Sequence, residues 1–401
     1  MKYKLSEIFE KPISGEWGNE LEEGKYGAKV IRTTNFTNMG RLNLNDIVER
    51  DIDVEKYKNK LLKLGDIIIE KSGGSPNQPV GRVVIFEENT SEKYFCNNFT
   101  SILRPKNIVN AKYSLYLLKD LYNKKRVLKY QNKTTGIINL KLNDYLNNTE
   151  IMIPSIEEQI KISTILDKSQ ELIDKRKEQI EALDELVKSK FIEMFGDPFR
   201  NPKGWTVKQL KEIILLANNG LARRGNDKDG NIVLRLVELQ DGFIDYSSPN
   251  RIRLTESEEK RYLLQDGDFL FARVNGNPDN VGRCSAYEDI GESVYHNDHI
   301  IRVRLDKNIV NNDYVSAILN SPYGKLQMKD KLKTSAGQYT INQNGISEIK
   351  ITIPPIELQN KFADFVKQVD KLKFEMEKSL KELEDNFNSL MQKAFKGELF
   401  N

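Results

Sequence analysis

The stretch "ITIPPIELQNKF" (Ile351–Phe362) lies 200 positions after a closely similar one, "IMIPSIEEQIKI" (Ile151–Ile162). The two stretches share Ile, Ile, Pro, Ile, Glu, Gln and Lys in register. A repeat of this kind indicates duplicated structural units and has to be found before a fold is predicted. The sequence therefore predicts two copies of one domain, each leading into this motif.

Each copy of the motif opens an apolar repeat typical of a coiled coil. Steps of four and three residues from Ile162 meet an apolar side chain at seven of ten positions, and the same steps from Phe362 do so at nine of ten. Such spacing over more than four heptads predicts two long helices. Each would be about 60 Å long at 1.5 Å per residue, which exceeds the width of an ordinary domain. We expect the helices to pack against each other rather than each on its own domain.

The ends of both helices carry start and stop signals. Ser155 followed by Glu158 forms a capping box before the first helix, and Pro354-Pro355 gives the second a rigid start. Gly196 and Gly397 are placed to end them. The predicted segments are a first domain over 1–155, a helix over 156–197, a second domain over 198–355 and a helix over 356–401.

The two domains repeat further motifs, more faintly, before each helix. Between these motifs the two halves differ almost completely, so two domains of one mixed α and β fold are predicted. The repeated pieces are a Gly-Asp turn with an apolar strand (Leu64–Ile69 and Asp266–Phe271), Val-Gly-Arg (80–82 and 281–283), Asn-Ile-Val-Asn (107–110 and 308–311) and a glycine-bearing loop (133–136 and 334–337).

Composition narrows the class of protein. The 401 residues are 38% hydrophobic and 30% charged, with no apolar run near the ~18 residues of a membrane span, and the start lacks the apolar core of a signal peptide. We expect a soluble, cytoplasmic protein without membrane contact. Cys96 and Cys284 are the only cysteines, which favours two unpaired, buried thiols. The net charge is +3; the two helical segments together carry −3, so the rest carries +6, a modest basic bias compatible with nucleic acid.

Taken together, the duplicated Ile-Pro-x-Ile-Glu-x-Gln helix start, the Gly-Asp strands and the Val-Gly-Arg pieces resemble the specificity (S) subunits of Type I restriction-modification enzymes. The resemblance covers essentially the whole chain, and the duplicated helix start is its most specific part. It implies an α+β protein with two target recognition domains related by a pseudo-two-fold axis and joined by two long antiparallel coiled-coil helices.

The resemblance also implies a function. Each target recognition domain would read one half of a split sequence in double-stranded DNA, while the chain itself would be non-catalytic and hold no cofactor. Two methyltransferase subunits, which use S-adenosylmethionine, and restriction subunits, which use ATP and magnesium, would be its partners. A rigid helical spacer would accept only half-sites at a fixed distance, because the grooves of B-DNA repeat every ~34–36 Å.

Candidate DNA contacts are polar side chains in the glycine-bearing loops after the apolar strands. Arg, Lys, Asn and Gln read base edges, and Lys, Ser, Thr and backbone amides bind phosphates. For each residue the alternative of an ordinary polar loop stays open, with Arg82 and Arg283 structural. The candidates are Lys71, Ser72, Asn77, Gln78 and Arg82 in the first domain, and Arg273, Asn275, Asn277, Asn280 and Arg283 in the second.

A second candidate segment in each domain is basic and ends in a glycine-bearing loop. Lys133 and Thr134 in the first domain and Gln338 and Tyr339 in the second are candidate DNA contacts, although charged runs are often only solvated helix faces. At the helix starts, Glu157, Gln159, Glu357 and Gln359 are candidates for contact with partner subunits.

Catalytic motifs are missing from the sequence. There is no phosphate-binding G-x-x-x-x-G-K-[ST] loop, no glycine-rich cofactor loop between a strand and a helix, and no carboxylate set after Pro278-Asp279 for a metal-dependent nuclease. His296 and His299, the only histidines, have no accompanying ligands for a metal, so contact with DNA by His299, or surface packing, is favoured. A protein scaffold without DNA, a cryptic nuclease and the specificity subunit of a Type II-like enzyme stay open as alternatives.

Overall fold

The computed structural model describes residues 2–75, 77–134, 137–335 and 337–400, without the side chains of Lys133, Thr134 and Ser335. The chain forms two compact units: unit 1 is Met1–Lys177 with Lys378–Asn401, and unit 2 is Glu178–Glu377. Within the described residues, no helix combines the length and the apolar character needed to cross a membrane.

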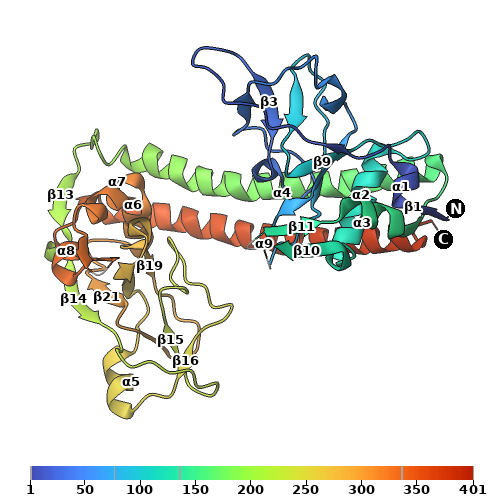
Figure 1. Cartoon of the computed structure of the whole chain (residues 1–401). Coiled ribbons are helices and arrows are strands. Elements are labelled where there is room, and N and C mark those ends of the chain that lie inside the picture. Colours follow the sequence, from blue (N-terminus) through green and yellow to red (C-terminus); the bar gives the residue numbers. More distant parts are fainter. Residues whose placement is uncertain (1, 76, 135–136, 336, 401) are drawn as a thin grey trace. The chain divides into compact units, whose positions relative to one another are not determined.

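Two long helices dominate the secondary structure, as the heptad spacing predicts. They are α4 (Ile156–Phe195) and α9 (Ile356–Lys396), of 40 and 41 residues, drawn in green and in red to orange in Figure 1. The boundary between the units falls within both helices, so each unit contains one half of α4 and one half of α9.

The predicted ends of the helices are confirmed. The Ser155 N–H donates to Oε2 of Glu158 at 3.1 Å, and the Glu158 N–H donates back to Oγ of Ser155 at 3.3 Å. This is the capping box, which supplies partners for backbone groups that the first helical turn leaves unpaired. Gly196 and Gly397 follow the last helical residues with φ of 81° and 79°, a left-handed conformation that favours glycine at a helix end.

In unit 1 the start of α4 packs against the end of α9. Ile162 and Leu166 of α4 are buried in one core with Met391 and Ala394 of α9. Further along, Lys177 Nζ lies 2.8 Å from a carboxylate oxygen of Glu384. Because rising numbers in α4 meet falling numbers in α9, the helices are antiparallel here.

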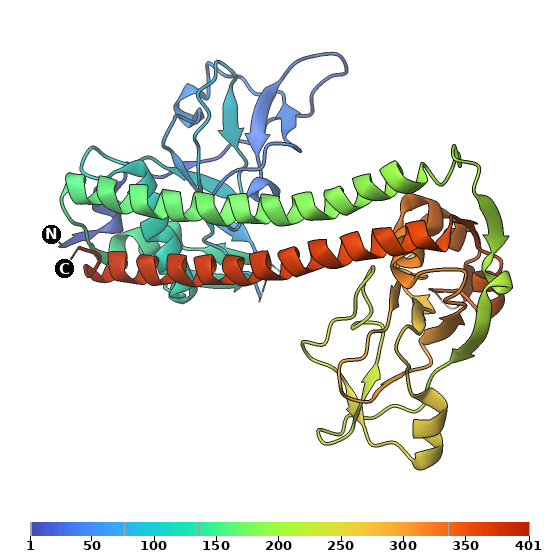
Figure 2. The same cartoon turned by 180° about the vertical axis from the view of Figure 1, so that it is seen from behind.

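In unit 2 the end of α4 packs against the start of α9. Phe191 and Phe195 share a core with Phe362, and the Phe195 and Phe362 rings lie 5.5 Å apart. Lys373 Nζ donates to Asp184 Oδ1 at 2.6 Å. The helices are therefore antiparallel in this unit too, and Figure 2 shows them side by side.

Each unit contains the same four sheets in the same strand order, which confirms the duplication inferred from the motifs. The largest is a four-stranded antiparallel sheet, and in both units its third strand follows the Gly-Asp turn. Its strands are β2 (Ile13–Ser14), β9 (Thr100–Leu103), β5 (Ile67–Glu70) and β7 (Val83–Ile85) in unit 1, and β14 (Ile214–Asn219), β21 (Ile300–Leu305), β17 (Phe269–Ala272) and β19 (Cys284–Ala286) in unit 2.

A second, three-stranded sheet in each unit contains one parallel pair. A two-stranded sheet joins the first strand of each domain to the strand that precedes the long helix. These strands are β4 (Val48–Arg50), β3 (Ala28–Ile31) and β8 (Tyr94–Cys96), with β1 (Lys2–Lys4) and β12 (Glu150–Met152), in unit 1; and β16 (Arg251–Ile252), β15 (Asn231–Leu234) and β20 (Val294–His296), with β13 (Thr206–Gln209) and β24 (Lys350–Ile353), in unit 2.

Short helices pack against the sheets of both units. In unit 2, Figure 1 shows α6 and α7 beside α9, and α5 at the far end of the unit next to β15 and β16. The helices are α1 (Leu5–Ile8), α2 (Ala111–Asn123) and α3 (Leu142–Asn148) in unit 1, and α5 (Glu256–Tyr262), α6 (Asn312–Asn320), α7 (Pro322–Lys329) and α8 (Gln343–Ser347) in unit 2.

The duplicated Gly-Asp motif holds a buried ion pair in each unit. Asp66 is 1% exposed and accepts hydrogen bonds from Arg104 Nε at 2.8 Å and Nη2 at 2.7 Å. Asp268 is 0% exposed and accepts from Arg304 Nε at 2.7 Å and Nη2 at 3.0 Å. Such bidentate pairs fix geometry, so the motif recurs because it ties two neighbouring strands together. Cys96 and Cys284 are free, buried thiols, as expected.

Candidate nucleic-acid interface

In each unit, a further three-stranded sheet brings the two predicted DNA-contact segments together. In unit 1 it consists of β10 (Gln131–Thr134), β11 (Ile137–Leu140) and β6 (Ser72–Gly73), with Asn139 opposite Ser72. We call this sheet, and its equivalent in unit 2, the hairpin sheet. The loop after the Gly-Asp strand and the basic segment, some 60 residues apart in sequence, thus form one surface.

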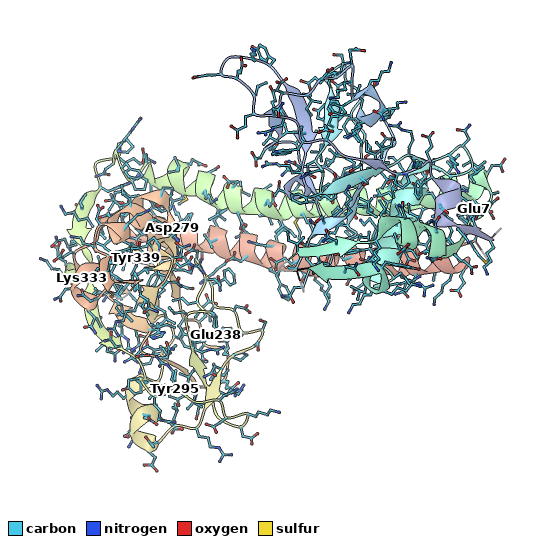
Figure 3. All side chains as sticks on the ribbon, in the orientation of Figure 1. Glu7, Glu238, Asp279, Tyr295, Lys333 and Tyr339 are labelled. Atoms are coloured by element: carbon cyan, nitrogen blue, oxygen red, sulfur yellow. The ribbon has the colours of Figure 1, made fainter. Side chains whose placement is uncertain are left out.

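The hairpin sheet of unit 2 consists of β22 (Lys333–Ser335), β23 (Gln338–Thr340) and β18 (Val274–Asn275). Asn275 lies opposite Tyr339 in the register. Figure 3 shows Lys333 and Tyr339 in the same part of unit 2 as Asp279. The predicted residues of both segments are therefore neighbours in this unit as well.

Several predicted contacts on the hairpin sheets already serve the protein's own structure. Lys71 Nζ donates to Ser14 Oγ at 2.6 Å, and burial lowers the pKa of the Lys71 ammonium. Ser72 Oγ donates to Asn139 Oδ1 at 2.6 Å. In contrast, Asn77 and Gln78 are exposed in the loop that follows. The amide side chains of this loop are the ones that a DNA groove could reach.

Arg82 and Arg283 each follow a glycine whose position does not tolerate a side chain. Gly81 has φ of 109° and Gly282 of 80°; a Cβ on Gly282 would lie 2.3 Å from Met328 Sδ. Arg82 donates from Nε and Nη2 to the buried carboxylate of Glu70, at 2.9 and 3.1 Å. This ion pair favours the structural alternative for Arg82, because the Nε and Nη2 side of its guanidinium is already used.

In unit 2, Ala272 stands where Glu70 stands in unit 1, and the carboxylate near Arg283 is that of Asp241, 3.6 Å from Nε. Arg283 instead donates from Nη1 to Gln240 Oε1 at 3.0 Å and from Nη2 to Asn280 Oδ1 at 2.8 Å. Arg283 and Asn280 thus hold each other, which orders the loop.

Some of the remaining predicted residues of this loop also bond within the loop, and others are exposed. Asn275 Oδ1 accepts from the Asn277 N–H at 2.9 Å, and Asn277 Oδ1 accepts from the Asp279 N–H at 3.0 Å. The side chain of Asn277 is nevertheless exposed, as is that of Gln338, and Tyr339 is half-buried. The side chains of Lys133 and Thr134 lie outside the described residues.

Unit 2 also has a cavity that sequence reasoning did not find. Its volume is about 390 Å³, its walls are largely apolar, and Asn250, Asn297 and His299 lie among its lining residues. Three arginines also line it: Arg223, Arg224 and Arg235. The adjacent arginines of "LARRG" (Leu221–Gly225) were the available signal, but nothing in the sequence placed them beside His299.

Each of these arginines pairs with a carboxylate that is more buried than itself. The side chain of Arg223 is 45% exposed against 19% for Glu258, and that of Arg235 is 43% against 4% for Glu238. The hydrogen bond from Arg223 lowers the pKa of Glu258 to about 2. Fixed guanidinium groups of this kind are suited to carboxylate, phosphate or guanine ligands.

His299 connects the cavity to the hairpin sheet. Its carbonyl oxygen accepts from the Arg273 N–H at 2.7 Å, and Arg273 Nη1 donates to the carbonyl of Asp298 at 3.1 Å. Burial, and the charges of Arg224 and Arg273, lower the pKa of the His299 imidazole. This shift favours the neutral form of the ring. Among the described residues, no group of three or more His, Cys, Asp or Glu could hold a metal ion.

The two glutamines of the helix-start motif are buried, at 1% for Gln159 and 0% for Gln359. Gln159 Oε1 accepts from the Asn110 N–H at 2.8 Å, and Nε2 donates to the carbonyls of Ile108 and Pro154. Burial leaves this side chain no surface for a partner, which corrects the expectation that the glutamines contact partner subunits.

Gln359 makes the same three bonds in unit 2, to the Asn311 N–H and to the carbonyls of Ile309 and Pro354. The Asn-Ile-Val-Asn and Glu-x-Gln motifs recur together because they bind each other. Glu157 and Glu357 are exposed, so contact with partners stays a prediction for them.

Comparison with known proteins identifies the family. The family model for the Type I restriction modification DNA specificity domain matches residues 1–182 and 202–385. The Type I restriction enzyme StySPI specificity subunit of Salmonella potsdam is 28% identical over 92% of this chain and 82% of its own length. The EcoKI specificity subunit of Escherichia coli K12 is 27% identical over the same shares.

Two solved structures share the fold. A chain from a study of complex assembly and conformational transition of the type I R-M system matches with a TM-score of 0.58, at 14% identity and over 100% of this chain and 98% of that one. The S subunit from M. genitalium matches with a TM-score of 0.56, at 16% identity and over 98% and 96%. The duplicated motifs, the fold and the family model agree: this chain belongs to the Type I restriction-modification specificity subunits.

Proposed function

We propose that this chain binds a split target in double-stranded DNA and directs methyltransferase and restriction subunits to it. The observation that carries the proposal comes from comparing the two units: their buried contacts agree, and their exposed polar side chains do not. The buried contacts that hold the strands are the same in both units, whereas the polar side chains of the hairpin sheets differ at nearly every position. Two readers of unlike half-sites need a common scaffold and different contacts.

The two long helices explain why the target would be split at a fixed distance. Helices of 40 and 41 residues, paired in antiparallel fashion within each unit, resist bending more than a loop of the same length would. We infer that they set the spacing of the two half-sites, since a change in spacing also changes the direction in which each groove faces.

We propose that catalysis belongs to partner subunits. Two methyltransferase subunits would supply S-adenosylmethionine chemistry, and restriction subunits would use ATP and magnesium, in the cytoplasm. The exposed carboxylates of Glu157 and Glu357, at the same place in the two copies of the helix-start motif, are suited to bind two copies of one partner, because duplicated surfaces present the same contact twice.

The test is to express the chain with its cognate methyltransferase and to map adenine methylation across a genome. A single motif of two half-sites separated by a fixed gap is expected. Lengthening α4 and α9 by one heptad each should keep both half-sites and change only the gap. A gap that varies freely, or methylation without any motif, would contradict the proposal.

A further inference from the structure

This inference rests on the proposed function. If each unit recognises its own half-site, the residues that determine the bases recognised must be exposed, well-positioned polar side chains that differ between the two units. The Arg224 region of unit 2 meets this condition most clearly. The Leu221 N–H donates to the carbonyl of His296 at 2.9 Å, just as the Glu16 N–H donates to that of Cys96 at 2.7 Å in unit 1. This shared contact aligns the loops, so Arg224 corresponds to Asn19.

His299 corresponds to Phe99 by a second shared contact. The Lys71 N–H donates to the carbonyl of Phe99 at 2.9 Å, as the Arg273 N–H does to that of His299 at 2.7 Å. At these positions unit 1 has an amide and an apolar ring where unit 2 has a guanidinium and an imidazole. The backbone of Phe99 is held as that of His299 is, whereas Asn19 is bonded to Asp51 by its own backbone N–H and carbonyl.

The Arg224 side chain is exposed but fixed. It is 55% exposed, and Nη1 donates to Asp298 Oδ1 at 2.7 Å and to the carbonyl of Ala222 at 3.0 Å. Its Nη2 lies 3.0 Å from His299 Nε2. Because arginine nitrogens only donate, His299 Nε2 is the acceptor of this hydrogen bond, and the lowered pKa of His299 favours the neutral ring that this requires. Holding a long side chain in place before binding reduces the entropy that binding costs.

These contacts occupy one side of the guanidinium and leave the other side open. Three of the five N–H hydrogens of Arg224 are used, while Nε makes no hydrogen bond to any residue that the structure describes. Nε and the second Nη2 hydrogen form the side-on fork by which arginine binds two acceptors at once. In duplex DNA, a base edge with two adjacent acceptors is that of guanine, with O6 and N7 in the major groove.

We propose that Arg224, positioned by Asp298 and His299, reads a guanine in the half-site bound by unit 2. Arg224 is the specificity-determining residue, and Asp298 and His299 act through it as positioning residues. Arg273 links this contact to the hairpin sheet through its bonds to Asp298 and His299, so the two form one continuous reading surface.

The experiment compares the wild-type chain with the Arg224→Ala variant, each in complex with the cognate methyltransferase. Methylation is mapped across a genome, and binding is measured on duplexes of the wild-type motif. We expect Arg224→Ala to relax one guanine position in one half-site and to weaken binding about 5- to 150-fold, the equivalent of the 1–3 kcal/mol of a bidentate base contact. The other half-site and the gap should not change.

A duplex with 7-deazaguanine at that position, which lacks N7, gives the sharper readout. It should weaken the binding of the wild-type complex and leave that of Arg224→Ala unchanged. Arg200→Ala removes a more exposed arginine of unit 2, at 85% against 55% for Arg224, and serves as the control, with an unchanged motif. Thermal unfolding of each variant excludes loss of the fold as the cause.

Three results would overturn the assignment: an unchanged motif in Arg224→Ala, relaxation in both half-sites, or a uniform loss of affinity on all sequences with a smaller salt dependence, which indicates a phosphate contact. If the wild-type complex itself gives no two-part motif, the proposed function fails instead. The positioning role predicts a further difference: His299→Gln, which keeps an acceptor, should retain the guanine preference, whereas His299→Phe, the residue of unit 1, should lose it.

Discussion

Asp66 in unit 1 is bound by one arginine, whereas its counterpart Asp268 in unit 2 lies between two. Arg104 is the partner of Asp66; Asp268 has Arg304 at 2.7 Å and Arg302 at 3.8 Å. Among the residues that the structure describes, this duplicated carboxylate thus has a second arginine nearby in unit 2 but only one in unit 1. The units share a scaffold but differ in how much of it depends on a single side chain, and this difference can be measured.

The largest expected effect is that of Arg104→Met in unit 1. It leaves the Asp66 carboxylate buried without a charged partner, with the backbone N–H of Lys63 still donating to it at 2.8 Å, and this should reduce the free energy of unfolding of unit 1 by about 3–5 kcal/mol. Arg304→Met in unit 2 should cost clearly less, because Arg302 remains. The two tryptophans, Trp17 in unit 1 and Trp205 in unit 2, allow urea unfolding of each unit to be followed separately in Trp→Phe backgrounds. Equal losses in the two units would contradict this reading.

The second prediction concerns acid stability. Burial lowers the pKa of His296 to about 4 from an ordinary value near 6.5, while the residue in its place in unit 1, Cys96, does not titrate in this range. The unfolded chain takes up the proton first, so the contribution of neutral His296 is complete above pH 6.5 and is lost as the pH falls to about 4. The loss should be about 3 kcal/mol for unit 2.

His296→Cys, which copies unit 1, should remove this pH dependence from unit 2. The measurement is the urea midpoint of each unit between pH 7 and pH 4, read from Trp17 or Trp205. Unit 1 is the internal control, since its midpoint should not respond to the substitution. If the midpoint of unit 2 keeps the same slope with pH after His296→Cys, another group is responsible.

The third prediction tests where the units are alike. Gln159→Ala and Gln359→Ala each leave a backbone N–H and two carbonyls of a buried turn without partners, so each should cost its own unit about 1–3 kcal/mol. Gln368→Ala on the exposed face of α9 should cost nothing. A loss of stability in only one unit would show that the glutamine of the helix-start motif stabilises that unit alone.

The smallest effect is expected at the helix starts, where the units differ again. Ser155→Ala removes the side-chain cap of α4 and should destabilise unit 1 by about 1 kcal/mol. Pro355 occupies this place before α9 and offers no side-chain acceptor, so Pro355→Ala should not show that loss. Urea unfolding of both variants decides the matter.

Much of the scaffold could be predicted from the sequence because its signals are local or duplicated. The seam of the long helices, the capping box at Ser155 and the Gly-Asp strands were all visible as spacing. Their duplication also showed that two units share one fold. What the motifs are for was less visible: the tie between Gln159 and Asn110 spans 49 residues, and only the structure shows that two repeated motifs bind each other.

The candidate site was predictable only in part. The sequence predicted the two segments of each hairpin sheet as separate candidates for DNA contact, and only the structure shows that they are paired strands. Sequence spacing also could not tell Asn77, which is exposed, from Arg82, whose charge Glu70 already neutralises. Arg224 and His299 lie 75 residues apart, and no periodicity links them. Base-reading contacts depend on such long-range proximity, which a single sequence does not reveal.

The division of the chain has a consequence for its synthesis. Unit 2 is one continuous segment, whereas unit 1 needs residues from Lys378 onward to cover its core, where Met391 and Ala394 close over Leu166 and Tyr113. At 5–20 residues per second, a ribosome takes roughly 10–40 s to make the intervening 200 residues. During that time the apolar core of unit 1 is partly uncovered, so nascent chains should depend on chaperones at this stage. Unit 2 should reach its native state before unit 1.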